Sequence, residues 1–368
     1  MKKLKKLLGL FIPFAMGGVI GGFAAASIAE MPYPIPVKLA LLFVGVVLGM
    51  YFQIAIHEAG HLAGGLMSGY KFVSYRIGSL MLTRINGKLE LKRYSVAGTG
   101  GQCLMAPPDM QNGIMPVILY NIAGPLANII AAAIFGTLYF VIPEPAVGML
   151  CMMMAVIGLF FGLTNGIPMR GVVDNDGRNA LSLGKNPAAM RVLWVQLKIN
   201  EYMSQSIRLK DMPKELFEMP ETNDMNNALV ASLPVFRANM LMDSHDFEAA
   251  DELMTQLVTM KSALPAIYKS LLNSDRATCA VIAGKNGEEL LSKDDKKIMR
   301  AMKTSLGVIR TEYALALYKK DAAKAEKLLK SFEKIAKNYP YPGEEASERE
   351  LVDIVRAALT NELTQSIM

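Results

Sequence analysis

Cysteine, histidine and charge are all scarce in this sequence. Its 368 residues include three cysteines and three histidines, and only 20% of the residues are charged. Three cysteines cannot supply the disulfide framework of a small secreted domain. A hydrophobic content of 52% excludes a disordered chain. The sequence therefore belongs to a folded protein whose apolar fraction lies a little above the soluble norm of about 45–50%.

The charges that are present are unevenly distributed. Residues 1–199 contain 16 Lys and Arg but only 7 Asp and Glu, whereas residues 200–368 contain 23 and 26. The positive excess lies beside apolar segments and not in a basic, aromatic-rich patch, so it does not indicate nucleic-acid binding. We expect a membrane-embedded domain over 1–199, ending in an amphipathic connector, and a cytoplasmic domain over 200–368.

Long uncharged segments predict membrane helices, because a spanning helix needs about 20 apolar residues. The predicted spans are 7–29, 39–66, 113–142 and 146–164. A cleaved signal peptide is the alternative for the first, but its apolar run exceeds the usual length of roughly 7–15 residues. Lysines precede the first span, and six Lys and Arg lie in the 67–112 loop. The positive-inside rule therefore predicts a multi-pass cell-membrane protein with both termini in the cytoplasm.

The second predicted span contains an H-E-x-x-H pattern, His57-Glu58-Ala59-Gly60-His61. Positions i and i+4 share one face of a helix, so both imidazoles can bind one zinc ion. Glu58 is placed to take a proton from the water that such a site activates. Ionisable groups within a membrane span normally mark function, which favours a metal centre over a polar helix end. Its place in the span predicts a position near the cytoplasmic face.

A catalytic zinc ion usually takes a third protein ligand. The carboxylates expected on the cytoplasmic side of the membrane domain are Glu90, Asp109, Asp174 and Asp176. Residues 165–177 contain Pro168 and three glycines, which exclude a regular helix. Irregular backbone at membrane depth is tolerated where it lines a cavity, so an aspartate there can reach the metal. Cys103 and Cys151 are thiol alternatives.

Three motifs, in this order, resemble the site-2 proteases, a family of intramembrane zinc metalloproteases. They are His57–His61, the N-x-x-G-P segment Asn121–Pro125, and Asn165–Pro168 followed by Asp176-Gly177. The resemblance covers residues 39–180. It implies His57, His61 and Asp176 as zinc ligands and Glu58 as the general base. It also implies Asn165 as the residue whose amide stabilises the oxyanion. The 11-residue distance from Asn165 to the aspartate exceeds the family's spacing, so Asp174 stays an alternative, although Gly177 favours Asp176.

The loop between the second and third spans has two recognisable segments. Residues 80–94 alternate apolar and polar residues around Asn86-Gly87, which predicts a β-hairpin. The hairpin is either a structural flap or a sheet edge that pairs with an extended substrate. Residues 98–108, with their glycines and two prolines, predict a loop that re-enters toward the site. In the third span, Asn128 is expected to make a packing hydrogen bond.

From about residue 225 the pattern is helical. Residues 246–254 and 321–329 are similar, and each segment follows an apolar helix. This resembles a degenerate tetratricopeptide-like solenoid, with a plain helical bundle as the alternative. Such domains bind segments of other proteins, so we expect a protein partner or self-association through 200–368. His245 is expected to be a turn residue.

The sequence thus predicts a mainly α fold with four transmembrane helices, a small β-hairpin region and an all-α cytoplasmic helical-repeat domain. The predicted function is a zinc-dependent intramembrane endopeptidase. Its substrates would be membrane-anchored proteins or remnant peptides, cut near the cytoplasmic face among membrane lipids. A non-catalytic scaffold and a transporter are the alternatives. Glu58 argues against the scaffold, because a structural zinc site needs no base, and the small number of spans argues against the transporter.

Overall fold

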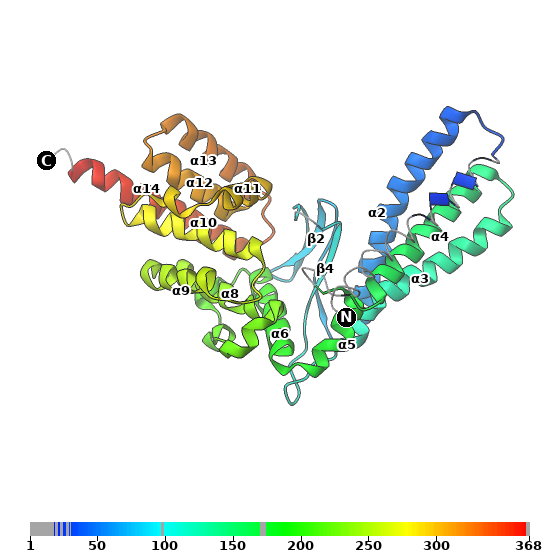
Figure 1. Cartoon of the computed structure of the whole chain (residues 1–368), viewed down its shortest axis with the longest axis horizontal. Coiled ribbons are helices and arrows are strands. Elements are labelled where there is room, and N and C mark those ends of the chain that lie inside the picture. Colours follow the sequence, from blue (N-terminus) through cyan, green and yellow to red (C-terminus); the bar gives the residue numbers. More distant parts are fainter. Residues whose placement is uncertain are drawn as a thin grey trace. The chain divides into compact units, whose positions relative to one another are not determined.

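The computed structural model describes residues 31–96, 99–169 and 174–365, with a few isolated positions between 18 and 29. The predicted span 7–29 lies almost entirely outside these residues. The chain divides into two compact units (Figure 1), which are described separately below. The membrane unit comprises Met1–Gly78 and Thr99–Pro187, and the helical unit comprises Ser79–Gly98 and Ala188–Met368.

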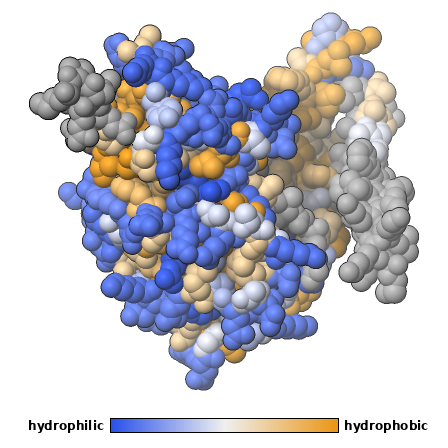
Figure 2. Space-filling model, turned by 60° about the vertical axis from the view of Figure 1, so that its left-hand side comes forward, coloured by the Kyte–Doolittle hydropathy of each residue, from blue (hydrophilic) through white to orange (hydrophobic). Residues whose placement is uncertain are grey.

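Three long helices dominate the membrane unit. They are α2 (Ile35–Met67), α3 (Ile118–Val141) and α4 (Pro145–Gly166). Within the described residues, these three are long and apolar enough to cross a membrane. They match the second, third and fourth predicted spans. Hydrophobic side chains gather on their surface, whereas the helical unit is largely hydrophilic (Figure 2).

Helices α2 and α3 approach each other closely at the turns that carry the H-E-x-x-H pattern. A Cβ atom added at Gly60 would lie 2.4 Å from the Ala123 carbonyl oxygen, and one at Gly64 would lie 2.5 Å from the Ala123 Cβ. Small residues allow this kind of backbone contact between membrane helices. The metal-binding face of α2 is therefore held directly against α3.

Strands β1 (Lys71–Ile77) and β4 (Gly101–Ala106) pair antiparallel in the membrane unit. The loop predicted for 98–108 is therefore wrong over the residues of β4. The pairing runs from Ile77 opposite Gly101 to Lys71 opposite Ala106, with a bulge near Phe72. This partner lies far away in the sequence, so the glycine-rich local pattern could not reveal the strand.

Strands β2 (Leu80–Ile85) and β3 (Lys88–Arg93) pair antiparallel and confirm the predicted hairpin. Asn86 and Gly87 have φ angles of 48° and 82°, the left-handed conformation that a type I′ turn requires. Both strands belong to the helical unit, where Met81 is buried in the core and the Tyr94 ring packs on Tyr339. These contacts favour the structural interpretation of the hairpin.

The remaining elements are helical. The membrane unit ends with α5 (Asp176–Ser182) and the 3-10 turn η1 (Leu183–Lys185). The helical unit then contains α6 (Pro187–Ser204), η2 (Leu209–Asp211), η3 (Lys214–Phe217), η4 (Thr222–Asn226), α7 (Ala228–Ala231), α8 (Leu233–Asp243), α9 (Phe247–Thr259), α10 (Ala266–Ile282), η5 (Gly287–Leu290), α11 (Lys293–Ala301), α12 (Leu306–Tyr318), α13 (Ala322–Ala336) and α14 (Pro342–Gln365). Helix α6 runs through the predicted boundary at residues 199 and 200.

The two similar sequence segments form the same local structure. His245 and Lys320, at the ends of the α8–α9 and α12–α13 turns, have φ angles of 62° and 58°. The side chains of Asp246 and Asp321 then cap α9 and α13. Each accepts a hydrogen bond from the main-chain nitrogen three residues later in the sequence. The internal similarity therefore reflects two helical hairpins with the same turn, and His245 is the predicted turn residue.

Candidate metal centre

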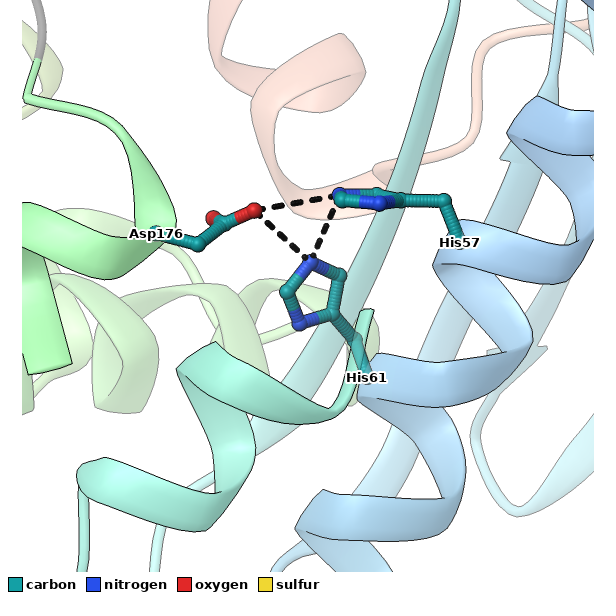
Figure 3. A group of neighbouring side chains, drawn as sticks. All are labelled: His57, His61 and Asp176. Atoms are coloured by element: carbon teal, nitrogen blue, oxygen red, sulfur yellow. Dashed lines mark hydrogen bonds and ion pairs between the residues drawn. The ribbon is translucent and has the colours of Figure 1, made fainter. Parts of the chain in front are cut away.

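Three side chains of the membrane unit point their donor atoms at one another (Figure 3). His57 Nε2 lies 3.1 Å from His61 Nε2 and 3.1 Å from Asp176 Oδ2. His61 Nε2 lies 3.5 Å from the same carboxylate oxygen. Among the described residues, no other group of three His, Cys, Asp or Glu side chains is arranged in this way.

The two imidazoles come from successive turns of α2, and each is oriented by a bond from its other nitrogen. His61 Nδ1 lies 2.7 Å from the Tyr120 carbonyl oxygen, and His57 Nδ1 lies 2.6 Å from Asn128 Oδ1. Since a carbonyl oxygen only accepts, the proton of a neutral imidazole sits on Nδ1, and Nε2 presents a lone pair. Partners of this kind fix the tautomer and the direction of metal-binding histidines.

Asn128 is held in its orientation by a second set of bonds. Its Nδ2 donates to the main-chain oxygen and to Oε1 of Gln53, at 2.8 Å each, and Gln53 Nε2 donates to the Met154 carbonyl. Its oxygen is therefore the atom that faces His57. Asn128 and Gln53 are fully buried. The expected packing hydrogen bond of Asn128 is in fact a contact with a candidate ligand.

Asp176 begins helix α5 and reaches the imidazoles from its first turn. The preceding Asn175 fixes this turn: its Oδ1 accepts from the main-chain nitrogens of Arg178 and Met169, and its Nδ2 donates to the Thr164 and Ile167 carbonyls. Burial opposes ionisation of Asp176, but the two imidazoles, which carry a positive charge and an Nε2 proton when they are protonated, outweigh this effect and lower its pKa to about 2. Asp176 is therefore an anion throughout the physiological pH range.

The other candidates from the sequence lie elsewhere. The Asp174 carboxylate lies 3.8 Å from Arg178 Nε. Glu90 pairs with Lys92, and neither Cys103 nor Cys151 belongs to the three-residue group. Of the two aspartates left open by the sequence, Asp176 is thus the one that the fold brings to the histidines.

Glu58 is buried on α2 beside the two histidines, and its side chain contacts strand β4. A Cβ atom at Gly101 would lie 2.8 Å from Glu58 Oε1, so only glycine allows the strand to pass this closely. The strand is itself tied to α3, since the Tyr120 hydroxyl donates to the Cys103 carbonyl at 3.0 Å. Asn165 is partly buried near the end of α4, where its Nδ2 donates to the Phe161 carbonyl at 3.0 Å.

The three donors fit a zinc ion by distance and by chemistry. Ligands at about 2.0–2.2 Å from a tetrahedral metal lie roughly 3.3–3.6 Å from one another. The observed separations of 3.1, 3.1 and 3.5 Å are close to this value. Two imidazole lone pairs and one carboxylate also form a donor set that attracts a cation.

Comparison with protein-family models gives one match. The model of peptidase family M50 matches residues 45–278, more than half of the chain. The chain belongs to peptidase family M50. No curated protein and no solved structure matches it.

Peptidase family M50 is a family of metallopeptidases, the site-2 proteases. Membership therefore supports the function of a membrane metalloprotease. M50 peptidases are zinc-dependent, in agreement with the donor set. The geometry also explains the N-x-x-G-P segment of this M50 chain. A Cβ atom at Gly124 would lie 2.5 Å from His61 Nε2, so glycine leaves the room that this imidazole occupies.

The roles of Gln53 and Asn128 in this M50 chain were not predicted from the sequence. Their signal was present, because uncharged polar side chains deep in apolar spans must find hydrogen-bond partners. What the pattern could not reveal was the identity of those partners. His57 and Asn128 are 71 residues apart and meet only when α2 packs on α3.

Proposed function

We propose that the chain is a zinc-dependent intramembrane endopeptidase that hydrolyses membrane-anchored proteins or remnant peptides near the cytoplasmic face. The observation that carries this proposal is the convergence of His57, His61 and Asp176 beside the buried carboxyl of Glu58. Family membership supports the same reaction class.

The proposed zinc ligands are the two histidines and Asp176, with Asn128 and the Tyr120 carbonyl holding the imidazoles in place. When bound, zinc supplies a Lewis acid that acidifies water and polarises the scissile carbonyl. A site pre-oriented by such partners needs little rearrangement to hold its ligands in position. This is the role that we assign to the hydrogen bonds of the two Nδ1 atoms.

Glu58 is the proposed general base. It takes a proton from the attacking water on a carboxylate oxygen while the water oxygen bonds to the scissile carbon. The same carboxyl then delivers this proton to the leaving nitrogen as the C–N bond breaks, so one water is consumed and an acid and an amine are released. Contact with β4 keeps Glu58 out of bulk water and fixes its direction.

Asn165 is the proposed oxyanion-stabilising residue. One hydrogen of its side-chain amide is used by the Phe161 carbonyl. An amide nitrogen carries two hydrogens, so the second is the one that this role requires. A single donor of this kind typically contributes about 100- to 1,000-fold to the rate.

The proposed topology has the N-terminus and residues 200–368 in the cytoplasm, on the side of the metal centre. It is supported by the lysines and arginines of the N-terminus and of the 67–112 loop. We further propose that the helical unit is a tetratricopeptide-like repeat domain, on the strength of the matching capped turns before α9 and α13. Repeat domains of this kind bind protein segments.

A comparison of wild type with Glu58→Gln tests the proposal. Membranes of cells that produce either form are analysed by mass spectrometry for protein fragments that end within an apolar span. We expect such fragments with the wild type alone, and equal zinc content in both purified proteins. A non-catalytic scaffold predicts identical fragment sets, and that outcome would reject the proposed function.

A further inference from the structure

A cavity of about 290 Å³ lies within the helical unit, lined mainly by α8, α10, α12 and α14. None of the candidate zinc ligands belongs to it. Phe236, Met242 and Leu271 contribute to its apolar wall. Ligand sites in proteins range from roughly 300 to 1,000 Å³, so this cavity suits one or two residues of a longer ligand.

Two buried polar atoms of residues that line the cavity have no hydrogen-bond partner among the described residues. Arg310 is 2% exposed; its Nε and Nη2 bind Glu348 and Asp275 at 2.7 and 2.6 Å, but its Nη1 has no hydrogen-bond partner within the described part of the chain. The same holds for the hydroxyl of Ser274, which is 1% exposed. Buried donors are nearly always paired, and an unpaired one costs about 1–3 kcal/mol. Both atoms are shielded from solvent, so the charges and the apolar wall of the cavity determine what it can bind.

Carboxylates outnumber guanidinium groups around the cavity. Its acidic residues are Asp243, Asp275, Glu344 and Glu348, and its basic residues are Arg208 and Arg310. The excess of negative charge favours a cationic ligand. A ligand that combines a positive charge with apolar surface is a polypeptide with lysine or arginine beside an apolar residue.

We propose that this cavity binds the Lys- and Arg-rich segment that flanks a membrane span of a substrate protein on its cytoplasmic side. Such flanks carry an excess of Lys and Arg next to apolar residues. The identification of a substrate as the source rests on the proposed function, whereas the preference for a basic, apolar peptide rests on the cavity alone. Binding there raises the local concentration of the substrate.

Direct peptide binding tests this proposal. The full chain in non-ionic micelles is titrated at pH 8 into a fluorescently labelled peptide of alternating leucine and lysine, and the anisotropy is measured. The control peptide has glutamine in place of lysine, and empty micelles give the background. At pH 8 Glu344, whose pKa burial raises to about 7, is ionised.

Two pairs of variants locate the binding. Ser347→Phe fills the cavity, and Ala346→Phe places the same ring on the exposed side of α14. Glu344→Gln removes one cavity charge, and Glu345→Gln removes a charge that pairs with Arg349 outside the cavity. Circular dichroism checks that each variant is folded. If Ser347→Phe does not fold, the comparison of Glu344→Gln with Glu345→Gln decides the outcome.

We expect the lysine peptide to bind at least about tenfold more tightly than the glutamine peptide. Ser347→Phe should weaken binding at least about tenfold and Glu344→Gln about fivefold, while their controls stay at the wild-type value. Equal affinity for both peptides overturns the proposal. So does an equal loss of peptide affinity in each cavity variant and its control. Tighter binding after replacement of the lysines in residues 2–6 by glutamine also overturns it, because the chain's own N-terminus would then be the occupant.

The peptide readout is independent of proteolysis. Glu58→Gln should bind the peptide as the wild type does, even though it cleaves nothing. If the wild type cleaves nothing but still prefers the lysine peptide, the proposed function alone is rejected. Cleavage that is present in a chain with no peptide selectivity would reject the cavity proposal alone.

Discussion

Replacement of Gly124 by alanine tests the metal centre through a residue that is not one of its ligands. The added Cβ would lie 2.5, 2.7 and 2.9 Å from Nε2, Cε1 and Cδ2 of His61. Favourable contacts between such atoms begin at about 3.5 Å, so the ring and the methyl group must separate by about 1 Å. Gly124→Ala therefore pushes directly on the nitrogen that faces Asp176.

Neither partner can give way without loss of the site. The ring is held by the 2.7 Å bond from Nδ1 to the Tyr120 carbonyl, and α3 already touches α2 at Gly60. A retreat of α3 would also withdraw Asn128 from His57. Zinc sites tolerate deviations of only about 0.2 Å in their ligand distances, so a displacement of this size removes one ligand.

The expected loss of zinc affinity is at least about 100-fold, or about 2.7 kcal/mol, because loss of an orienting partner alone costs about 10- to 100-fold. Zinc affinity is measured by competition with a chromophoric chelator, and metal content by mass spectrometry. Gly136→Ala, also on α3, is the matched control, since the nearest neighbour of its added Cβ would be the Ala155 Cβ on α4, 3.9 Å away. Wild-type affinity in Gly124→Ala would refute the geometry on which this reasoning depends.

Further predictions address the ligands, the base and the helical unit. Glu58→Gln should keep its zinc but lose at least about 100-fold in activity, since it removes a general base and no ligand; loss of metal would show that Glu58 is a ligand. Asp176→Asn should lose zinc while Asp174→Asn retains it, which metal analysis of both proteins decides. Asn128→Leu should lower zinc affinity by about 10- to 100-fold, because the imidazole that it orients loses its partner; an unchanged chelator titration contradicts this role. Burial raises the pKa of Glu344 to about 7, so its folded form holds a proton that the unfolded form releases above about 4.5. The contribution of this proton to the stability of the helical unit is full below about pH 4.5 and is lost as the pH rises through about 7. Thermal unfolding of Glu344→Gln should therefore show a smaller decrease in stability between pH 5 and 8.

Local chemistry in the sequence was sufficient for a large part of this protein. The four-residue spacing of His57 and His61 places both rings on one face of any helix, whatever packs against it. Long apolar segments made α2, α3 and α4 predictable, because the bilayer sets the length of a spanning helix. Asn86-Gly87 specified its turn through the positive φ angles of those two residues alone.

Only the tertiary structure decided the features that depend on contacts between distant segments. Strand β4 exists because its backbone pairs with β1, and a glycine-rich stretch carries no local sign of such a partner. The selection of Asp176 over Asp174 depends on how Asn175 ties the turn to α4. Asn128 orients His57 only after two helices have packed together. Contacts of this kind form when the gain from packing exceeds the entropy of bringing remote residues together, and that balance is a property of the whole fold and not of any short pattern.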